Sequence, residues 1–454
     1  MNTKSPVAAV ADLLAEQLGA ERVLLPGSAY DEALPIWNGA VTSRPALLVR
    51  CRWASDVQAV VRAAREHGLP LSVRGGGHDW AGRSLRDGGV VIDLSEMRTV
   101  EIDAQAEVAT VAGGARAADV AAAAAPFGLA AATGTVGAVG MAGLTLGGGY
   151  GPLMANFGLA LDNLVGVDIV LADGRLVTAD AINEPDLFWA LRGGGGNFGV
   201  VTSLRIQLHP IAEVIAGLIF FPWSQAEDIW HGYVDLIADA PDELTVQTGV
   251  LTGPDGNPTL YMAPVWSGQD LADGQKWMDR LQQLGTSLMA QLAPMPYGAM
   301  LGLFDAQIAN GRHYEIKTRP LPALSTGAVA ALIKAGEAKT SPTSGIVLHH
   351  LRGAGTRVAE GETAFGLRRE HFTVEIVAAW EPGEDAVLHR GWAAETWADL
   401  EPFALPGGYP NLLGPGETEQ IAEAYGENAA RLRAVKERFD PEGVFTATPL
   451  PLAH

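Results

Sequence analysis

The stretch of sequence that decides the fold reads Ser72-Val73-Arg74-Gly75-Gly76-Gly77-His78-Asp79-Trp80-Ala81-Gly82, in which three consecutive glycines lead into one histidine. Because glycine has no Cβ, the backbone here can pass close to a ligand, and its N–H groups can face an anion. The imidazole that follows is a nucleophile. The stretch therefore indicates either a phosphate-bearing cofactor beside a reactive His78 or a glycine turn that carries an incidental histidine.

The composition and charge of the chain narrow the class of protein. Its 454 residues exceed what one hydrophobic core usually supports, so two domains are expected. Hydrophobic residues make up 48% of the chain and charged residues 18%, which is typical of a globular protein. The formal net charge of −21 repels the phosphates of nucleic acids and anionic lipids. We therefore expect neither a nucleic acid nor a membrane as partner.

The number of cysteines and the N-terminal residues indicate the cellular compartment of the protein. The single cysteine, Cys51, excludes an internal disulfide framework and a thiolate metal cluster, and no metal site is expected. Residues 1–18 lack the basic and apolar regions of a secretory signal, so a cytoplasmic protein is predicted. Residues 120–150 carry no charge, but their proline and repeated glycines favour a buried segment that faces a ligand over a membrane span.

Strand and helix patterns divide the chain near Pro210. Before it, a strand at 46–51, a helix ending at His67 and a strand at 70–74 lead into the glycine turn. After it, strongly alternating strands at 345–351 and 371–379 occur among helices. This second region predicts a domain built around an antiparallel sheet.

Two further groups of glycines follow the first. Gly134, Gly137, Gly140 and Gly143 recur at every third residue and precede Gly147-Gly148-Gly149-Tyr150-Gly151, a spacing that suits an extended backbone lying flat against a partner. The third group is the run from Arg192 to Val201, which contains a G-x-G-x-x-G match. A helix precedes this match and a strand follows it, the reverse of the order in a dinucleotide-binding fold, so we reject that interpretation.

These motifs carry a family resemblance. Together with Gly158-Leu159-Ala160-Leu161-Asp162-Asn163 and the ending Tyr409-Pro410-Asn411, they resemble the FAD-linked oxidases of the vanillyl-alcohol oxidase superfamily, in the berberine-bridge-enzyme-like branch that includes bacterial 6-hydroxynicotine oxidases. The resemblance implies an α+β, PCMH-type FAD-binding fold with a split FAD domain. It places that domain at residues 1–212 (core about 40–210), a substrate domain of antiparallel sheet covered by helices at 213–400, and a segment completing the FAD domain at 401–454.

The resemblance also implies how FAD is held. His78 would bond covalently to the 8α-methyl group of FAD, while the backbones of 74–77 and 137–140 would line the pyrophosphate. Relatives with a second link carry a cysteine two residues after the position of Gly134, where this chain has Val136, so no cysteinyl link is expected. The full set of expected FAD contacts is His78, Arg74, Gly75, Gly76, Gly77, Gly134, Gly137, Val139, Gly140, Gly147, Gly148, Gly149, Asp162, Asn163, Gly199 and Val201.

Candidate catalytic residues come from the second domain and the C-terminal segment. Alternation along the strand at 371–379 puts Thr373, Glu375 and Val377 on one face. Glu375 in an apolar pocket would have a raised pKa and could act as a general base, or it could be a strand glutamate paired with Arg368. The remaining candidates follow from the resemblance: His350 rather than His349, with Tyr409 and Asn411, while Phe157 stands where plant relatives carry a catalytic tyrosine.

The predicted function is that of an FAD-dependent oxidase. A C–H next to N or O of a small organic substrate would give a hydride to flavin N5, and O2 would reoxidise the flavin to give H2O2. Two alternatives are a flavin dehydrogenase that uses another acceptor and a catalytically silent nucleotide-binding protein. The expected partners are a small-molecule substrate and O2, in a monomer or homodimer.

Overall fold

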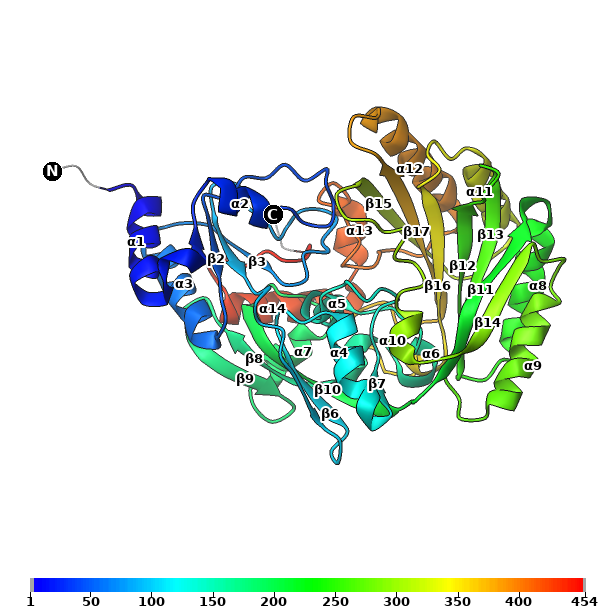
Figure 1. The fold of residues 1–454 in the computed structure, drawn as a ribbon, viewed down its shortest axis with the longest axis horizontal. Coiled ribbons are helices and arrows are strands. Elements are labelled where there is room, and N and C mark those ends of the chain that lie inside the picture. Colours follow the sequence, from blue (N-terminus) through cyan, green and yellow to red (C-terminus); the bar gives the residue numbers. More distant parts are fainter. Residues whose placement is uncertain (1–3, 452–454) are drawn as a thin grey trace.

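The computed structural model describes residues 4–451, which form three sheets and the helices that cover them (Figure 1). The first sheet is small and lies nearest the N-terminus. Strand β1 pairs antiparallel with β2, whereas β2, β4 and β3 run parallel, and helices α1 (Pro6–Leu18) and α3 (Ala54–Glu66) pack beside it. Its strands in spatial order are β1 (Val23–Leu24), β2 (Leu47–Arg50), β4 (Val90–Asp93) and β3 (Leu71–Arg74).

The second sheet is antiparallel and is built around the long strand β10. Its core includes the alanine-rich helix α4 (Ala117–Ala124), whose small side chains allow close packing, and α7 (Pro185–Leu191). Its strands are β5 (Val100–Asp103), β6 (Val108–Ala112), β10 (Val200–Pro210), β8 (Leu164–Val170) and β9 (Leu176–Asp180), and β7 (Leu129–Ala131) pairs with the end of β10.

The third sheet has seven antiparallel strands and carries four long helices on its side away from the other sheets (Figure 1). The strands in spatial order are β14 (Met289–Met295), β11 (Val214–Pro222), β13 (Pro258–Trp266), β12 (Leu244–Thr252), β16 (Gly345–Leu351), β17 (His371–Trp380) and β15 (His313–Leu321). The helices are α8 (Ala226–Ala238), α9 (Leu271–Gln282), α11 (Thr326–Glu337) and α12 (Ala386–Leu400). The expected α+β class, with an antiparallel sheet covered by helices, is confirmed.

Strand alternation decides which side chains of the third sheet reach its open face. On β17, Val374 and Ile376 pack in the core beneath the helices, so Glu375 between them points the other way. On β16, Leu348 packs in the same core and His349 points to the open face. Because the apolar side chains of each strand are buried beneath the helices, the polar side chains between them point to the open face of the sheet.

The C-terminal residues return to the first half of the molecule. Helix α14 (Ala429–Phe439) packs against α7, and the buried ammonium of Lys436 donates to Asn197 O (2.6 Å) and Phe445 O (2.7 Å). Lys436 also pairs with Asp440 at 2.5 Å. These contacts join the chain end to the third glycine run. The short helices are α2 (Ser28–Ala33), α5 (Met141–Gly147), α6 (Met154–Phe157), α10 (Tyr297–Met300) and α13 (Thr418–Glu423).

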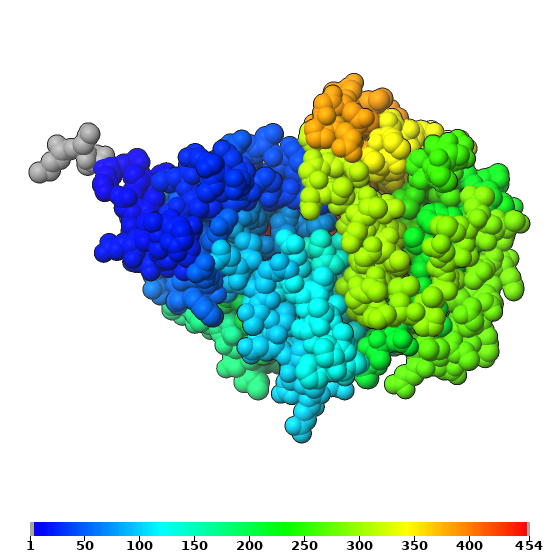
Figure 2. Space-filling view, viewed as in Figure 1, coloured from blue at the N-terminus to red at the C-terminus, as the bar shows by residue number. Residues whose placement is uncertain are grey.

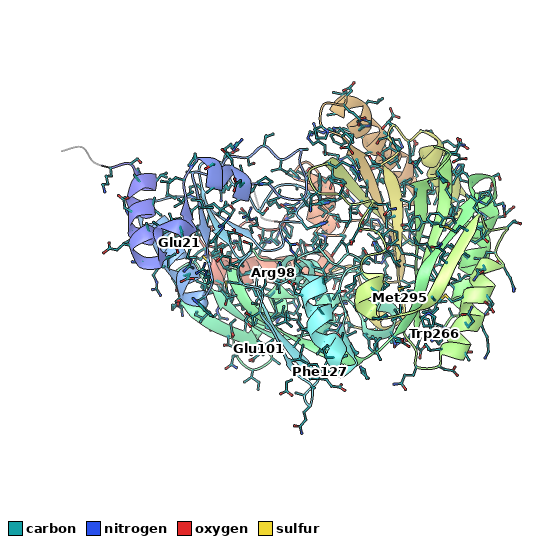
Figure 3. All side chains as sticks on the ribbon, viewed as in Figure 1. Glu21, Arg98, Glu101, Phe127, Trp266 and Met295 are labelled. Carbon is teal, nitrogen blue, oxygen red and sulfur yellow. The ribbon has the colours of Figure 1, made fainter. Side chains whose placement is uncertain are left out.

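The uncharged segment 120–150 begins in the core at Val120 and reaches the surface at the exposed Phe127 (Figure 3). It then returns to the interior, where Gly134, Gly140 and Tyr150 reach the central cavity. Among residues 4–451, no helix is long and apolar enough to span a membrane.

Candidate functional site

A large cavity separates the first two sheets from the open face of the third sheet. Its volume is about 420 Å³, and both halves of the chain line it. In Figure 2, the N-terminal residues in blue and cyan adjoin later residues in green and yellow. Glycine-rich backbone makes one wall, and polar side chains on β12, β16 and β17 make the opposite wall. The arrangement suits a ligand with an extended polar part and a reacting end.

The glycine wall depends on close contact between two backbones. Gly76 and Gly140, distant in sequence, lie so close that a Cβ on either residue would collide with the backbone of the other. Gly77, at φ +70°, takes the left-handed conformation that glycine adopts at no steric cost. The triple glycine therefore allows both a tight turn and a close backbone contact, and together these position the next residue, His78.

Replacing Gly76 with alanine is expected to destabilise the fold by about 1–3 kcal/mol, because the new methyl group has no space. The matched control is Gly391→Ala in α12, where nothing lies within 4 Å of the added Cβ. This control should leave stability unchanged or raise it by about 0.5–1 kcal/mol. Denaturant unfolding of both variants measures the difference. Equal stabilities would show that the Gly76–Gly140 contact is not needed.

His78 ends the glycine wall with a free ring nitrogen. Its Nε2 is shielded from solvent and has no hydrogen-bond partner among the described residues. Burial lowers the pKa of His78 to about 4, so the ring is neutral near pH 7. The ring stacks on Trp37 at 4.3 Å between centroids, and Trp37 stacks on Tyr314 at 3.9 Å. The result is a neutral nucleophile held in one orientation at the cavity wall.

Two tyrosines meet in the cavity with complementary hydrogen bonds. His371 Nδ1 lies 2.7 Å from Arg369 O and must donate to it, which leaves Nε2 as an acceptor; the Tyr150 hydroxyl is its nearer donor at 2.8 Å, and the Thr373 hydroxyl lies at 3.0 Å. The Tyr409 oxygen accepts from Gly149 N and from Asn411 Nδ2, both at 2.9 Å. The Tyr409 hydroxyl is therefore free to donate into the cavity, while Tyr150 presents its oxygen as an acceptor.

Burial also shifts the pKa values of this cluster. It raises the pKa of Tyr409 to about 12 and that of Tyr150 well above its ordinary value, so both hydroxyls are protonated near pH 7. It lowers the pKa of His371 to about 4, so that this imidazole is neutral. The cluster can therefore orient a substrate by hydrogen bonds without carrying charge.

The buried His371 predicts a pH dependence of stability. Between its folded pKa of about 4 and its ordinary value of 6.5, the unfolded chain binds a proton that the folded chain does not bind. The free energy of unfolding should therefore fall as the pH drops from 6.5 to 4, by about 1.4 kcal/mol per pH unit for one such proton. Denaturant unfolding across this window measures the slope, and His371→Gln should reduce it. An unchanged slope would contradict the assignment.

Glu375 is the carboxylate that faces the reacting end of the cavity. Its Oε1 lies 3.3 Å from His349 Nε2, on the neighbouring strand β16. Arg368, the alternative partner expected from the sequence, instead pairs with Asp162 at 2.8 Å. Glu375 thus lies beside an imidazole and remains open to a ligand in the cavity.

The expectation that His350 faces the cavity is not met. Its ring stacks on Phe372 at 4.0 Å, and its two nitrogens contact Glu370 and Tyr233 on the helix-covered side. Adjacent strand residues point to opposite faces, so His349 takes the cavity position.

Several expected FAD contacts lie outside the cavity lining, because other buried partners hold them. The Arg74 guanidinium pairs with Asp93 at 2.7 Å, Asp162 pairs with Arg368, and Asn163 Nδ2 donates to Phe157 O and Leu159 O. Gly137 packs against α4 and Leu301. The closely packed backbones of Gly147, Gly148 and Gly149 instead adjoin Asn411, Tyr409 and Ala160.

The other expected residues are brought together in one lining. They are Gly75, Gly76, Gly77, His78, Gly134, Val139, Gly140, Gly199, Val201, Glu375, Tyr409 and Asn411.

Tyr150 and His349 lie in the lining although the sequence reasoning did not propose them. Tyr150 directly follows the triple glycine 147–149, a signal that could have identified it. Phe157, expected to mark the place of a catalytic tyrosine, stacks on His209 at 3.8 Å outside the lining, whereas Tyr150 lies in the lining. Other lining residues with no clear sequence signal are Trp37, Gln247, Tyr261 and residues 445–448.

Comparisons with known proteins bear on this site. A model of the FAD binding domain matches residues 45–180, and the model "Berberine and berberine like" matches residues 408–449. The FAD-linked oxidoreductase aurO of Gibberella zeae is 31% identical over 92% of this chain and 82% of its own length. The (R)-6-hydroxynicotine oxidase of Paenarthrobacter nicotinovorans is 32% identical over 92% of this chain and 93% of its own length.

The chain belongs to the berberine-like FAD-linked oxidoreductases. The resemblance found in its motifs is confirmed. A crystal structure of 6-hydroxy-D-nicotine oxidase from Arthrobacter nicotinovorans superposes on this oxidoreductase with a TM-score of 0.84 at 29% identity, covering 94% of this chain and 96% of that one.

The cavity of this FAD-linked oxidoreductase fits its cofactor. The cavity of about 420 Å³ beside the glycine wall offers space for a ligand, and His78 Nε2 is an orphaned buried atom at that wall. Asn197 fastens the third glycine run to the chain end, since its Oδ1 accepts from Ala447 N (2.7 Å) and its Nδ2 donates to Gly194 O (2.8 Å). The C-terminal residues 445–448 thereby become part of the lining.

Proposed function

We propose that this protein is an FAD-dependent oxidase of a small organic substrate that has a C–H next to N or O. The observation that carries the proposal is that Glu375, His349, Tyr150 and Tyr409 line the same cavity as the glycine wall and His78. Bound FAD would supply the two-electron acceptor for a hydride, and O2 would be reduced to H2O2.

The residues of the cavity would divide the work. Glu375 would accept the N–H or O–H proton of the substrate, with the imidazole of His349 in contact with its carboxylate. The Tyr150 oxygen and the Tyr409 hydroxyl would accept and donate hydrogen bonds that hold the substrate in a reactive orientation. Asn411 would keep the Tyr409 hydroxyl in place.

We propose His78 as the single covalent anchor of FAD, through an 8α-histidyl bond. Its neutral ring and unpartnered Nε2 support this role. A cysteinyl link is not proposed, because Val136 occupies the cavity wall where a cysteine would be needed. Cys51 lies in the core of the first sheet, where burial raises the pKa of its thiol.

The organisation and location of the protein are proposed on related grounds. The step from β10 to β11 passes from the second sheet to the third, and α12, which covers the third sheet, ends at Leu400; these two positions support boundaries at residues 1–212, 213–400 and 401–454. Cys51 is buried and unpaired, which suits a reducing compartment such as the cytoplasm. We propose a monomer or homodimer that acts on a small molecule.

The test is anaerobic mixing of the holoenzyme with matched amines, alcohols and oligosaccharides. Bleaching of the flavin absorbance identifies a substrate, and one H2O2 per substrate oxidised under air identifies an oxidase. Rapid bleaching with little H2O2 would instead favour a dehydrogenase that uses another acceptor. A protein that carries FAD but is bleached by no member of the set would overturn the proposed activity.

A further inference from the structure

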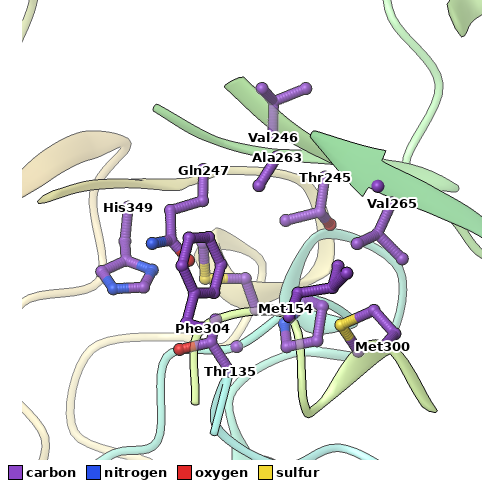
Figure 4. Close-up of a pocket in the computed structure, with 14 residues that line it drawn as sticks. Thr135, Met154, Thr245, Val246, Gln247, Ala263, Val265, Met300, Phe304 and His349 are labelled. Carbon is purple, nitrogen blue, oxygen red and sulfur yellow. The ribbon is translucent and has the colours of Figure 1, made fainter. Parts of the chain in front are cut away.

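A small apolar pocket opens beside the main cavity (Figure 4). Its volume is about 20 Å³, which is space for one or two water-sized groups. Met154, Val265 and Met300 line this pocket but not the main cavity, while Gln247, Phe304 and His349 belong to both. The pocket is therefore a side chamber of the reacting end rather than a separate site.

Gln247 lies at the boundary between the side pocket and the main cavity, and its side-chain oxygen is an unused hydrogen-bond acceptor. The residue lies on β12 and is 8% exposed, and its Nε2 donates to the Tyr261 hydroxyl at 2.9 Å. Its Oε1 is buried and has no partner among the described residues. Buried polar atoms are nearly always paired, so an unpaired acceptor beside a cavity points to a ligand that donates to it.

The charges at the boundary favour a cationic donor. The lining of the main cavity contains two carboxylates, and one of them, Asp79, pairs with Arg83 at 3.2 Å. For the other, Glu375, the imidazole of His349 is the only basic group within 4 Å among residues 4–451. A ligand at this end therefore meets one carboxylate and one free amide oxygen, a set that matches an ammonium group with N–H bonds.

We propose that the substrate is an amine with a small alkyl substituent on or next to its nitrogen. The substituent occupies the side pocket of Met154, Val265 and Met300, and the protonated nitrogen donates to Gln247 Oε1 as it enters. This proposal rests on the proposed oxidase function. Dioxygen, the other small apolar candidate, would leave the Gln247 acceptor unpaired, and so it fits the boundary less well.

The experiment uses the holoenzyme with amines and alcohols that share one scaffold and differ by hydrogen, methyl, ethyl or isopropyl at the nitrogen or oxygen. We expect amines to reduce the flavin anaerobically with a higher kcat/KM than alcohols do. Among the amines, methyl or ethyl should exceed isopropyl at least tenfold. Substrates that are all alcohols would overturn this proposal but keep the oxidase function, whereas the absence of any substrate would overturn the oxidase function itself.

Variants then test the two residue roles. Ala263→Leu, on β13 opposite Gln247, fills the side pocket and should abolish the preference for the alkylated amines. Gln247→Leu should raise the Kd of the preferred amine about 10- to 100-fold, and Gln247→Glu, which keeps an acceptor, should restore binding. Ala290→Leu on the exposed edge strand β14 is the matched control and should change neither quantity.

Two further measurements test the side pocket directly. Crystals of the holoenzyme under xenon should bind the gas in the side pocket, and the Ala263→Leu crystals should not. The flavin content and Tm of each variant show whether it is folded. An unchanged alkyl preference in folded Ala263→Leu overturns the proposal. The proposal is also overturned if Ala263→Leu is reduced normally by substrate without air but its flavin is reoxidised more slowly by O2, because the pocket would then serve dioxygen.

Discussion

The His78→Ala variant is expected to release all of its FAD on acid denaturation, whereas the unaltered protein should keep its yellow colour in the precipitate. The His78 imidazole is neutral, and its Nε2 has no other hydrogen-bond partner among the described residues. Alanine removes the nucleophile but leaves the glycine wall, so FAD should still bind noncovalently. Flavin absorbance in the pellet and in the supernatant measures the result.

A second buried histidine provides the control for this experiment. Burial also lowers the pKa of His209 to about 4, but its ring stacks on Phe157 outside the cavity lining. His209→Gln should therefore retain the covalent flavin. A colourless precipitate from the unaltered protein would contradict covalent attachment. A coloured precipitate from His78→Ala would move the attachment to another residue.

Glu375→Gln is expected to slow anaerobic flavin reduction by about 10²- to 10⁴-fold, the range over which loss of a general base acts. The amide keeps the shape of the side chain but cannot accept the substrate proton. Stopped-flow absorbance of the holoenzyme with its best substrate gives the rate of reduction. Tyr150→Phe should have a smaller effect, because Tyr150 is assigned to orientation rather than to proton transfer.

The matched control is Glu370→Gln, since Glu370 contacts His350 on the helix-covered side of the sheet. This variant should reduce at the normal rate. If Tyr150→Phe abolished reduction and Glu375→Gln left it unchanged, the base would be Tyr150, whose hydroxyl donates to His371.

Much of the fold could be predicted from the sequence, because the signals were local. The helix expected after the strand at 46–51 forms as α3, where Asp56 accepts from Trp53 N and starts the helix. The alternating strands at 345–351 and 371–379 form as β16 and β17. Alternation is a property of the extended backbone itself, so it also put Glu375 and Val377 on one face.

The candidate site was harder to predict where a residue had more than one available partner. The sequence offered Arg74 and Asp162 as cofactor contacts, yet each forms a buried ion pair, with Asp93 and Arg368 respectively. A buried charge is costly unless it is paired, so such partners take precedence over a ligand. The two residues of each ion pair are separated in the sequence, so no local sequence pattern predicts that they meet.

By itself, the sequence determined where the backbone must come close to a partner, because only glycine permits the contact between Gly76 and Gly140. It also placed one histidine at the end of that wall. Only the tertiary structure decided which polar side chains face His78. Alternation allows either His349 or His350 to face inward, and the packing of helices over one side of the third sheet selects His349.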